Sequence, residues 1–539
     1  MSSFANHASP NVTPPPANDL NQYAGPWGRE QVTHLLKRTM FGAKKADVDY
    51  FVGKGRILSV LELLNDKSSP GFPLNYYESD KVDTVPLGQT WVNEPRSATT
   101  EGSRLESYKY WWIGLMINQK RSIREKMVLF LSNLLATEDN EIGYARYAYK
   151  YNKLLRDNYL GNYKSLVKSI TLEPKMLIYL NGKLNKKASP DENYGRELQE
   201  LFTVGKGSGS GYTENDVKAA AKVLTGYSDD INTANYIFTS SNHDTTNKQF
   251  SSFYGNKIIT GKTGASGQEE LDDLMDMIFS TDEVSKYICR RIYNFFVYYD
   301  ITPEIETNII TPLAAKFKAS GYSLKTVMDT LLNSNHFYNK SIMGCVLKSP
   351  LDLIIGSARE FEFIFPSSSL TDIKNQYLSW KNLYTIAGNM LQSLGNPPNV
   401  AGWPAYYQAP QYHEIWINSD SYPKRNTFTN TIANGDGYPY GTYKVGVNIL
   451  NYIKGFKTPS DPNKLIVELV ERIYVRPLSQ ASLNSLKTLL IGTQSDSYWT
   501  LIWNDYLANP TNTTKADLVK NKLIALLQNM MKYAEYQLS

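Results

Sequence analysis

Apolar residues recur at intervals of three and four along most of this 539-residue chain. That spacing places them on one face of an α-helix, which can be buried against other helices. Residues 32–40 and 58–64 show it clearly, and residues 123–138 are apolar on nearly every side, as in a helix at the centre of a core. We therefore predict an all-α fold, a large irregular array of roughly twenty helices.

Two parts of the chain lack the helical spacing. Residues 235–253, "NYIFTSSNHDTTNKQFSSF", contain the best β-type alternation and predict a small hairpin. Residues 395–445 are rich in Gly, Pro, Asn and Tyr, and so long a connection in a helical protein is usually functional or mobile. Beside the helices we expect at most this hairpin and this long irregular loop region.

The first residues differ in composition from the rest of the chain. Residues 1–26 are mainly Pro, Asn, Ser and Ala, with little apolar material to bury, and predict a flexible N-terminal arm. Residues 27–539 show no fixed sequence period, so we predict a single large helical domain and not a repeat array. A division into two sub-lobes near residues 365–375 stays open, because a chain of this length often contains several domains.

Charge and motif content argue against several classes of function. The chain has 57 Lys and Arg against 52 Asp and Glu, and a net charge of +5 is too dilute to favour nucleic-acid binding. The two cysteines lack the CxxC spacing of zinc and redox sites, and we expect them to be reduced. No dinucleotide-binding, P-loop or zinc-protease motif occurs, so we predict no cofactor and no metal.

The sequence also indicates where in the cell the protein is located. No stretch approaches the roughly 18 uninterrupted apolar residues of a membrane span. The N-terminus lacks the charged and apolar regions of a signal peptide. We expect no membrane span, and a cytoplasmic location unless the protein is exported with a partner.

The stretch "SPDENYGRELQELFTVG", residues 189–205, concentrates charge on a helix that should be half buried. Ser189 is placed as an N-cap, with Glu192 as its capping-box partner. Along the predicted helix, Glu192, Arg196 and Glu200 stack at intervals of four beside the apolar stripe. In solvent each pair contributes only about 0.3–0.5 kcal/mol. The charges therefore indicate either a solvated helix surface or a site where Arg196 meets another element.

A second helix is predicted after the glycine-rich turn at residues 205–211. Thr213 is placed as its N-cap, with Asp216 as the capping-box partner. In a polar loop farther along, His243 and Asp244 form an adjacent pair of histidine and carboxylate. One histidine beside one acid is a weak metal signal. The alternatives are a site role for His243 or a loop histidine bonded to backbone groups.

The irregular region carries an aromatic-rich stretch, "NPPNVAGWPAYYQAPQYHEIWINSDSYPKR". In it Trp403, Tyr407 and Trp416 stand among prolines, and Arg425 closes the stretch. Such aromatic side chains can form the floor of a carbohydrate or peptide groove, with the arginine binding an anionic group. The alternative is that prolines and aromatic residues make the long loop rigid against the helical body.

Several stretches occur in an order typical of one family. They are "HLLKRTMFGAKKADVDYF", "REKMVLFLSNLLAT", "PKMLIYLNGKLNKKASPDENYGRELQELFTVG", "GYTENDVKAAAKVLTGY", "HDTTNKQF", "NPPNVAGWPAYY" and "AEYQLS". From about His34 to its end the chain resembles the bacterial family known as domain of unknown function 1800. The resemblance implies a mostly helical protein without a settled activity. Its members are often encoded beside a sulfatase- or phosphatase-like family with an export signal, which implies such a protein as a partner.

The resemblance also implies a set of polar positions. These are Glu192, Asn193, Arg196 and Glu197 on the first helix, and His243, Asp244 and Lys248 after the second. If they converge, one carboxylate or His243 is placed to act as general base, and Arg196 or Lys248 to stabilise negative charge. The chain departs from the family at Ser132 and Leu134, where many relatives carry histidine.

Two hypotheses follow. In the first, the protein is a rigid helical scaffold or binding protein whose aromatic loop meets a protein partner, the co-encoded sulfatase- or phosphatase-like protein. In the second, it is a hydrolase-like enzyme that uses the polar pocket. The missing histidine pair favours the first. Geometry separates them, because an enzyme needs its polar side chains around an open cavity.

Overall fold

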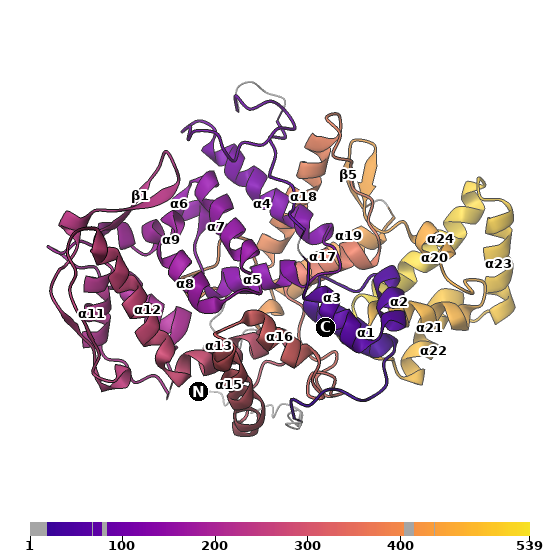
Figure 1. Ribbon diagram of the computed structural model, residues 1–539. Helices are drawn as coiled ribbons and strands as arrows, with labels where there is room; N and C mark the ends of the chain where they lie inside the picture. Colours follow the sequence, from indigo (N-terminus) through magenta and orange to yellow (C-terminus); the bar gives the residue numbers. More distant parts are fainter. Residues whose placement is uncertain (1–18, 67, 78–82, 208, 404–413, 436) are drawn as a thin grey trace, which may run out of the picture.

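The regular structure of the chain is almost all helical, which confirms the all-α prediction (Figure 1). The computed structural model describes residues 19–66, 68–77, 83–207, 209–403, 414–435 and 437–539. The first helices are α1 Arg29–Thr39, α2 Lys45–Lys54, α3 Arg56–Leu63, α4 Glu101–Ile117, α5 Arg124–Leu134, α6 Asp139–Ile142, α7 Ala145–Asp157, α8 Tyr163–Thr171 and α9 Pro174–Tyr179. The middle of the chain contributes α10 Asn193–Glu197, the π-helix η2 Leu198–Thr203, α11 Glu214–Val223, α12 Glu270–Ser280, α13 Asp282–Phe296, α14 Pro303–Ile305, α15 Thr311–Ala319, α16 Leu324–Leu332, α17 Pro350–Glu360 and α18 Ile373–Asn389. The last helices are α19 Ser421–Ala433, α20 Ile449–Lys454, α21 Pro462–Ile473, α22 Gln480–Ile491, α23 Asp496–Ala508 and α24 Thr513–Met530.

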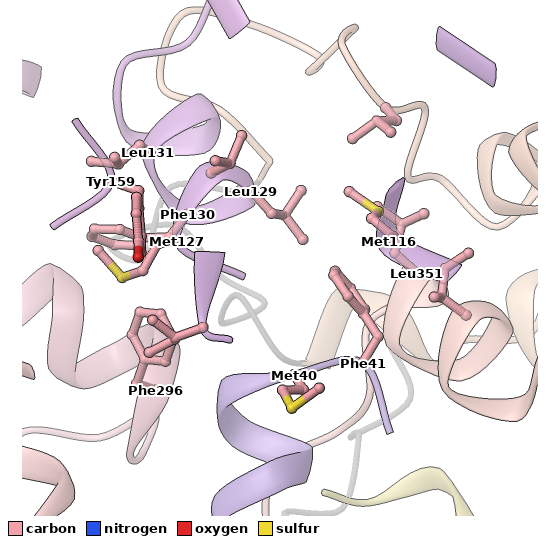
Figure 2. Close-up of a cluster of buried hydrophobic side chains, with 14 of the residues drawn as sticks. Met40, Phe41, Met116, Met127, Leu129, Phe130, Leu131, Tyr159, Phe296 and Leu351 are labelled. Carbon is pink, nitrogen blue, oxygen red and sulfur yellow. The ribbon is translucent and has the colours of Figure 1, made fainter. Parts of the chain in front are cut away.

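Helix α5 lies in the hydrophobic core, as the apolar stretch 123–138 predicts. Every residue of α5 except Ser132 is buried. Its side chains meet those of helices distant in sequence, and the ring centroids of Phe130 on α5 and Phe296 on α13 lie 5.8 Å apart. Figure 2 shows this core, with Met40, Phe41, Met116, Met127, Leu129, Phe130, Leu131, Tyr159, Phe296 and Leu351 labelled. Burial of each large apolar side chain contributes about 1.5–3 kcal/mol, so α5 anchors the helices around it.

The strands are short, and in the described part of the chain they form antiparallel pairs. The pairs are β1 Tyr227–Asp230 with β2 Asn235–Phe238, β3 Lys248–Gln249 with β4 Ile258–Ile259, and β5 Tyr438–Tyr440 with β6 Tyr443–Val445. The stretch predicted as one hairpin, residues 235–253, thus contributes to two, because β2 pairs with the strand before it and β3 with the strand after it. Asp230 fixes the first turn, since its carboxylate accepts hydrogen bonds from Asn232 N (2.9 Å) and Thr233 Oγ1 (2.8 Å).

The region predicted to be irregular, residues 395–445, contains regular structure. Helix α19 occupies thirteen of its residues, and the β5–β6 hairpin follows. Pro423 is tolerated in α19 because it lies in the first turn, where backbone N–H groups lack helical partners in any case. The expectation of a wholly irregular region is therefore wrong for α19. Residues 404–413, which include Tyr407, lie outside the described residues.

Both ends of the described chain pack against the helical body. The predicted arm covers residues 1–26, of which 1–18 lie outside the described residues. Tyr23 N donates to Asn333 O (2.8 Å), so the end of the arm lies along the turn after α16. At the other end, Ser539 N donates to Val346 O (2.8 Å). Helices α20 to α24 gather on one side of the molecule, coloured yellow at the right of Figure 1.

Candidate functional site

The helix that carries the charged stretch begins later than its sequence predicts. Its N-cap is Glu192, without a side-chain cap, so the capping box predicted at Ser189 is wrong. Ser189 instead pairs with Lys186 in an isolated β-bridge. Asp191 Oδ1 accepts from Asn193 N (2.9 Å) and thereby fixes the helix start. The capping box predicted for α11 at Thr213 is confirmed.

The charged helix changes its winding after one turn. Residues Leu198–Thr203 form the π-helix η2, and such segments are rare and frequent at functional sites. The buried side chain of Gln199 holds this segment, because it donates to Gly195 O (2.9 Å) and accepts from Tyr254 OH (2.8 Å). A Cβ at Gly195 would lie 3.2 Å from Ala221 N, so glycine allows α10 to cross α11 closely.

Arg196 meets an acidic residue of the second helix. Its Nη1 and Nη2 donate to the two carboxylate oxygens of Glu214 on α11, at 2.7 and 2.6 Å. Glu192 lies 3.4 Å from the same guanidinium, whereas Glu200 pairs with Lys206. The side chains of Arg196 and Glu214 are 33% and 66% exposed. Water therefore screens this cross-helix pair, whose contribution to stability is about 0–1 kcal/mol.

The polar loop after α11 forms a buried network around a residue that sequence analysis did not identify, Glu270 on α12. Its Oε1 lies 3.1 Å from His243 Nε2, and its Oε2 accepts from Lys248 Nζ at 2.5 Å. The backbone N–H of Lys262 also donates to Oε1 (2.6 Å). We call Glu270, His243 and Lys248 the Glu270 network. All three side chains are at most 1% exposed.

Hydrogen bonds settle how the Glu270 network is arranged. His243 Nδ1 lies 2.9 Å from the backbone oxygen of Thr225, which can only accept, so Nδ1 donates to it. His243 Nε2 faces Glu270 Oε1 at 3.1 Å. Burial acts to raise the pKa of Glu270, but hydrogen bonds from His243 and Lys248 outweigh it and hold the pKa below its usual value. The carboxylate form of Glu270 thus binds the loop to α12.

The other candidates near this loop have structural partners or lie elsewhere. Asp244 Oδ1 accepts from Thr246 N (2.8 Å), and Lys248 also donates to the backbone oxygen of Asp244. The structure brings His243, Asp244 and Lys248 together. It places Arg196 in a separate, solvent-facing pair. Within the described ranges, no hydrogen bond or ion pair joins the two groups.

Glu197, on α10, is a weaker acid than an ordinary glutamate. Burial, with a smaller contribution from Glu200, raises the pKa of Glu197 to about 7. A carboxyl group with that pKa is half protonated near neutral pH and is suited to accept or donate a proton. Glu197, one of the six predicted catalytic positions, thus has a pKa suited to proton transfer near neutral pH.

The aromatic-loop residues that the structure describes lie below the surface. Trp403, Trp416 and Arg425 are all buried. Arg425 donates to Trp416 O (3.0 Å), Gln537 Oε1 (3.0 Å) and Lys348 O (2.5 Å), and burial lowers its pKa to about 10. Its guanidinium therefore joins α19 to the chain end and does not face an open groove. This placement agrees with the alternative in which the loop stiffens the helical body.

A family model described as "Protein of unknown function (DUF1800)" matches residues 34–538. The chain belongs to the DUF1800 family. No curated protein and no solved structure matches it. In the part of this DUF1800 chain that the structure describes, no helix has the length and apolarity to cross a membrane. Nor do three or more His, Cys, Asp or Glu side chains there form a group able to hold a metal ion.

Three of the stretches that resemble the DUF1800 family converge in space. Asn133 Oδ1 on α5 accepts from Trp403 N (2.7 Å), and a Cβ at Gly402 would collide with the same oxygen. Lys175, from the stretch "PKMLIYLNG", forms a buried ion pair with Asp139 on α6. In this DUF1800 chain the contacts join α5 to the loop before residue 404, and α9 to α6, the helix that follows α5.

A small cavity lies where these stretches meet. It is lined by Tyr108, Trp112, Ser132, Thr137, Tyr151, Asn152, Leu155, Lys175, Gly395, Pro397 and Trp403. Ser132, one of the two positions at which many relatives carry histidine, lines it, whereas Leu134 is buried in the core. Sequence analysis identified Trp403 here but missed Lys175, Trp112 and Asn152. Its place in a family-like stretch could have pointed to Lys175, whereas Trp112 and Asn152 lie outside all of those stretches.

Proposed function

We propose that this DUF1800 protein is a helical scaffold that binds a protein partner through an exposed apolar face of α3. The observation that carries the proposal is the exposure of three large aliphatic side chains on this short helix. Ile57, Leu58 and Leu61 are 57%, 53% and 50% exposed. The other side of α3 is packed into the core through Val60 and Leu63. We call Ile57, Leu58 and Leu61 the α3 face.

Grouped apolar side chains in water are a common feature of protein-binding surfaces. Burying a large aliphatic side chain contributes about 1.5–3 kcal/mol when it is fully exposed beforehand, and these three are about half exposed. An ion pair between Lys54 and Glu62 borders the α3 face and supplies the polar rim typical of an interface. The partner we propose is the co-encoded sulfatase- or phosphatase-like protein that the family resemblance implies.

The burial of the polar loop also supports the proposal that the protein is a scaffold. Two of the six predicted catalytic side chains, His243 and Lys248, are committed to Glu270 and are out of contact with water. A substrate would have to break these ion pairs to reach them. The Glu270 network thus has the properties of a structural support.

The test is co-expression with the co-encoded phosphatase-like protein, followed by size-exclusion chromatography. The wild-type chain should elute with the partner, and a Leu58→Asp, Leu61→Asp variant should elute alone. Leu501→Asp on α23 is a matched control, because Leu501 is 67% exposed and lies outside the α3 face. A complex that survives both α3 substitutions, or that Leu501→Asp disrupts equally, would exclude the α3 face as the docking surface.

A hydrolase-like activity is the second candidate, and the acidity of Glu197 favours it. With a pKa of about 7, Glu197 could act as general base, beside the positive charge of Arg196 on the same helix. Turnover of chromogenic phosphate and carboxylate esters tests this. Glu197→Gln should abolish turnover while Glu304→Gln, an exposed control on α14, leaves it unchanged. Equal turnover by the two variants, or none by the wild type, would rule out this candidate.

A further inference from the structure

Two hollows adjoin on the outer face of helix α21, beside the starts of α1 and α2. Their volumes are about 310 and 350 Å³, within the usual range for pockets that bind small molecules. Arg29, Val467 and Glu471 line both hollows, so the two form one continuous groove. From Asn463 to Tyr474 the groove follows α21 for about 16 Å, the length of eleven helical steps. We call it the α21 groove.

The first hollow of the α21 groove has mainly apolar walls. They come from α21, from the segment after it and from α22, and include Val467, Val470, Tyr474, Val475, Leu478 and Leu483. The aliphatic side chain of Val467 is 43% exposed, so the groove opens to water where the two hollows meet. The first hollow therefore favours an apolar ligand group, because moving apolar surface out of water is favourable.

The second hollow is basic. Its charged lining residues are the cations Arg29, Lys45, Lys457 and Lys464 and the carboxylates Glu468 and Glu471. Three of the cations have a carboxylate partner, since Asp49 pairs with Arg29 and Lys45, and Asp461 lies 3.6 Å from Lys464 Nζ. In the part of the chain that the structure describes, no hydrogen bond or ion pair reaches the ammonium group of Lys457.

The two carboxylates of the second hollow are already committed to other groups. Glu468 forms an ion pair with Arg472 (2.5 Å), and its Oε2 accepts from the backbone N–H of Lys457 (2.9 Å). Glu471 Oε2 lies 4.0 Å from Arg29 Nε. With the outside partners Asp49, Asp461 and Arg472 counted, five cations face four carboxylates, so one positive charge is left over.

The charges at the two ends of the groove are even. In the first hollow one further cation, Arg476, is matched by one further carboxylate, Glu30. At the other end Asp496 accepts from Asn463 Nδ2 (2.8 Å) and pairs with Lys487 (2.6 Å). The second hollow thus keeps its one surplus positive charge.

We propose that the α21 groove binds an amphiphilic monocarboxylate, a ligand with an unbranched alkyl tail and one carboxylate group, of which a medium-chain fatty acid is the simplest example. The tail lies in the first hollow against Val470, Val475 and Leu483. The carboxylate lies in the second hollow, where it accepts from Lys457 Nζ and supplies the missing negative charge. This inference does not depend on partner binding at the α3 face.

Isothermal titration calorimetry of the full chain with dodecanoate, below the concentration at which micelles form, tests the proposal. Dodecanoate should bind at one site per chain. Dodecyltrimethylammonium has the same tail but a cationic head, and it should bind about 10-fold more weakly or worse because Lys457 repels it. Acetate, which lacks the tail, should not bind measurably. No binding of dodecanoate, or equal affinities for the two amphiphiles, would overturn the proposal.

Matched variants locate the site. Val467→Asp places a carboxylate between the hollows and Lys457→Met removes the unpaired cation, and each should weaken dodecanoate binding about 10-fold or more. The controls are Leu489→Asp, since Leu489 on α22 is also 43% exposed but lies outside the groove, and Lys218→Met, since Lys218 is an exposed lysine of α11. Both should keep the wild-type affinity. Wild-type affinity in either groove variant, or an equal loss in the controls, would contradict the proposal.

Crystals soaked with dodecanoate that carries bromine on its last carbon show how the ligand is oriented. The anomalous peak of bromine should lie in the first hollow near Val475 and Leu483, with the carboxylate at Lys457. A bromine peak beside Lys457, or one outside the α21 groove, would overturn the assignment of tail and carboxylate to the two hollows.

Discussion

Replacing Glu270 with glutamine should lower the free energy of unfolding by about 3–5 kcal/mol, the usual cost of removing one partner of a buried ion pair. Glu270 accepts from Lys248 Nζ (2.5 Å) and Lys262 N (2.6 Å), and its Oε1 lies 3.1 Å from His243 Nε2. Glutamine keeps the shape of the side chain but presents an NH₂ group to one of these donors. The ammonium of Lys248 is then left buried, with Asp244 Oδ1 at 3.9 Å as its nearest carboxylate.

Urea unfolding at pH 7, followed by circular dichroism, measures this change. An unchanged dependence of the unfolding free energy on urea would show that the variant exposes the same surface on unfolding. Arg196→Ala is the control: it removes an equally short but solvent-exposed ion pair and should cost about 0–1 kcal/mol. Because the pKa of Glu270 is held below that of the unfolded chain, its stabilisation is present above pH 4.5 and declines as the pH falls. A Glu270→Gln variant within 1 kcal/mol of wild type, or one no worse than Arg196→Ala, would refute the reasoning.

Two further predictions concern buried charges. Burial raises the pKa of Glu173 to about 7 against the opposing effect of Lys150, so its contribution to stability is present below about pH 4.5 and is lost as the pH rises through 7. In urea unfolding, the Glu173→Gln variant should therefore have the same free energy of unfolding as wild type at pH 4, and one about 2–3 kcal/mol higher at pH 8. Equal free energies of unfolding at pH 8 would contradict a raised pKa of the buried Glu173 carboxyl group. Arg425→Met should lower stability by about 3–5 kcal/mol in the same assay, because three buried acceptors lose their donor. Lys424→Met, which removes an exposed neighbour, should change it by about 0.5 kcal/mol at most, and similar losses in both variants would contradict a specific role for Arg425.

The helical fold could be predicted because its signals are local. A periodicity of three and four residues marks a helix within a short window, and the capping box at Thr213 lies within four residues. The N-cap predicted at Ser189 does not form, because a hydrogen bond outside the helix determines where the helix begins. Asn185 Oδ1 accepts from Asp191 N (3.0 Å), which holds the preceding residues in a turn until the helix begins at Asn193.

The functional groups could be predicted only where sequence neighbours share a site. His243, Asp244 and Lys248 do meet, but their principal partner, Glu270, stands 22 to 27 residues away and shows no motif. The small cavity lined by Ser132, Lys175 and Trp403 draws its walls from five separate segments between Tyr108 and Trp403, so no spacing rule could have identified it. Long-range packing sets these contacts, and among the lining residues only those in family-like stretches, such as Ser132, Lys175 and Trp403, had a signal in the sequence.

Hydrogen–deuterium exchange of the protein mixed with the proposed phosphatase-like partner tests the central claim most directly. On binding, amides of α3 and of the adjoining end of α2 should become protected, while the segment from His243 to Glu270 exchanges as it does in the free chain. Protection confined to that polar segment, or a stable complex in which α3 exchanges as in the free chain, would contradict the account.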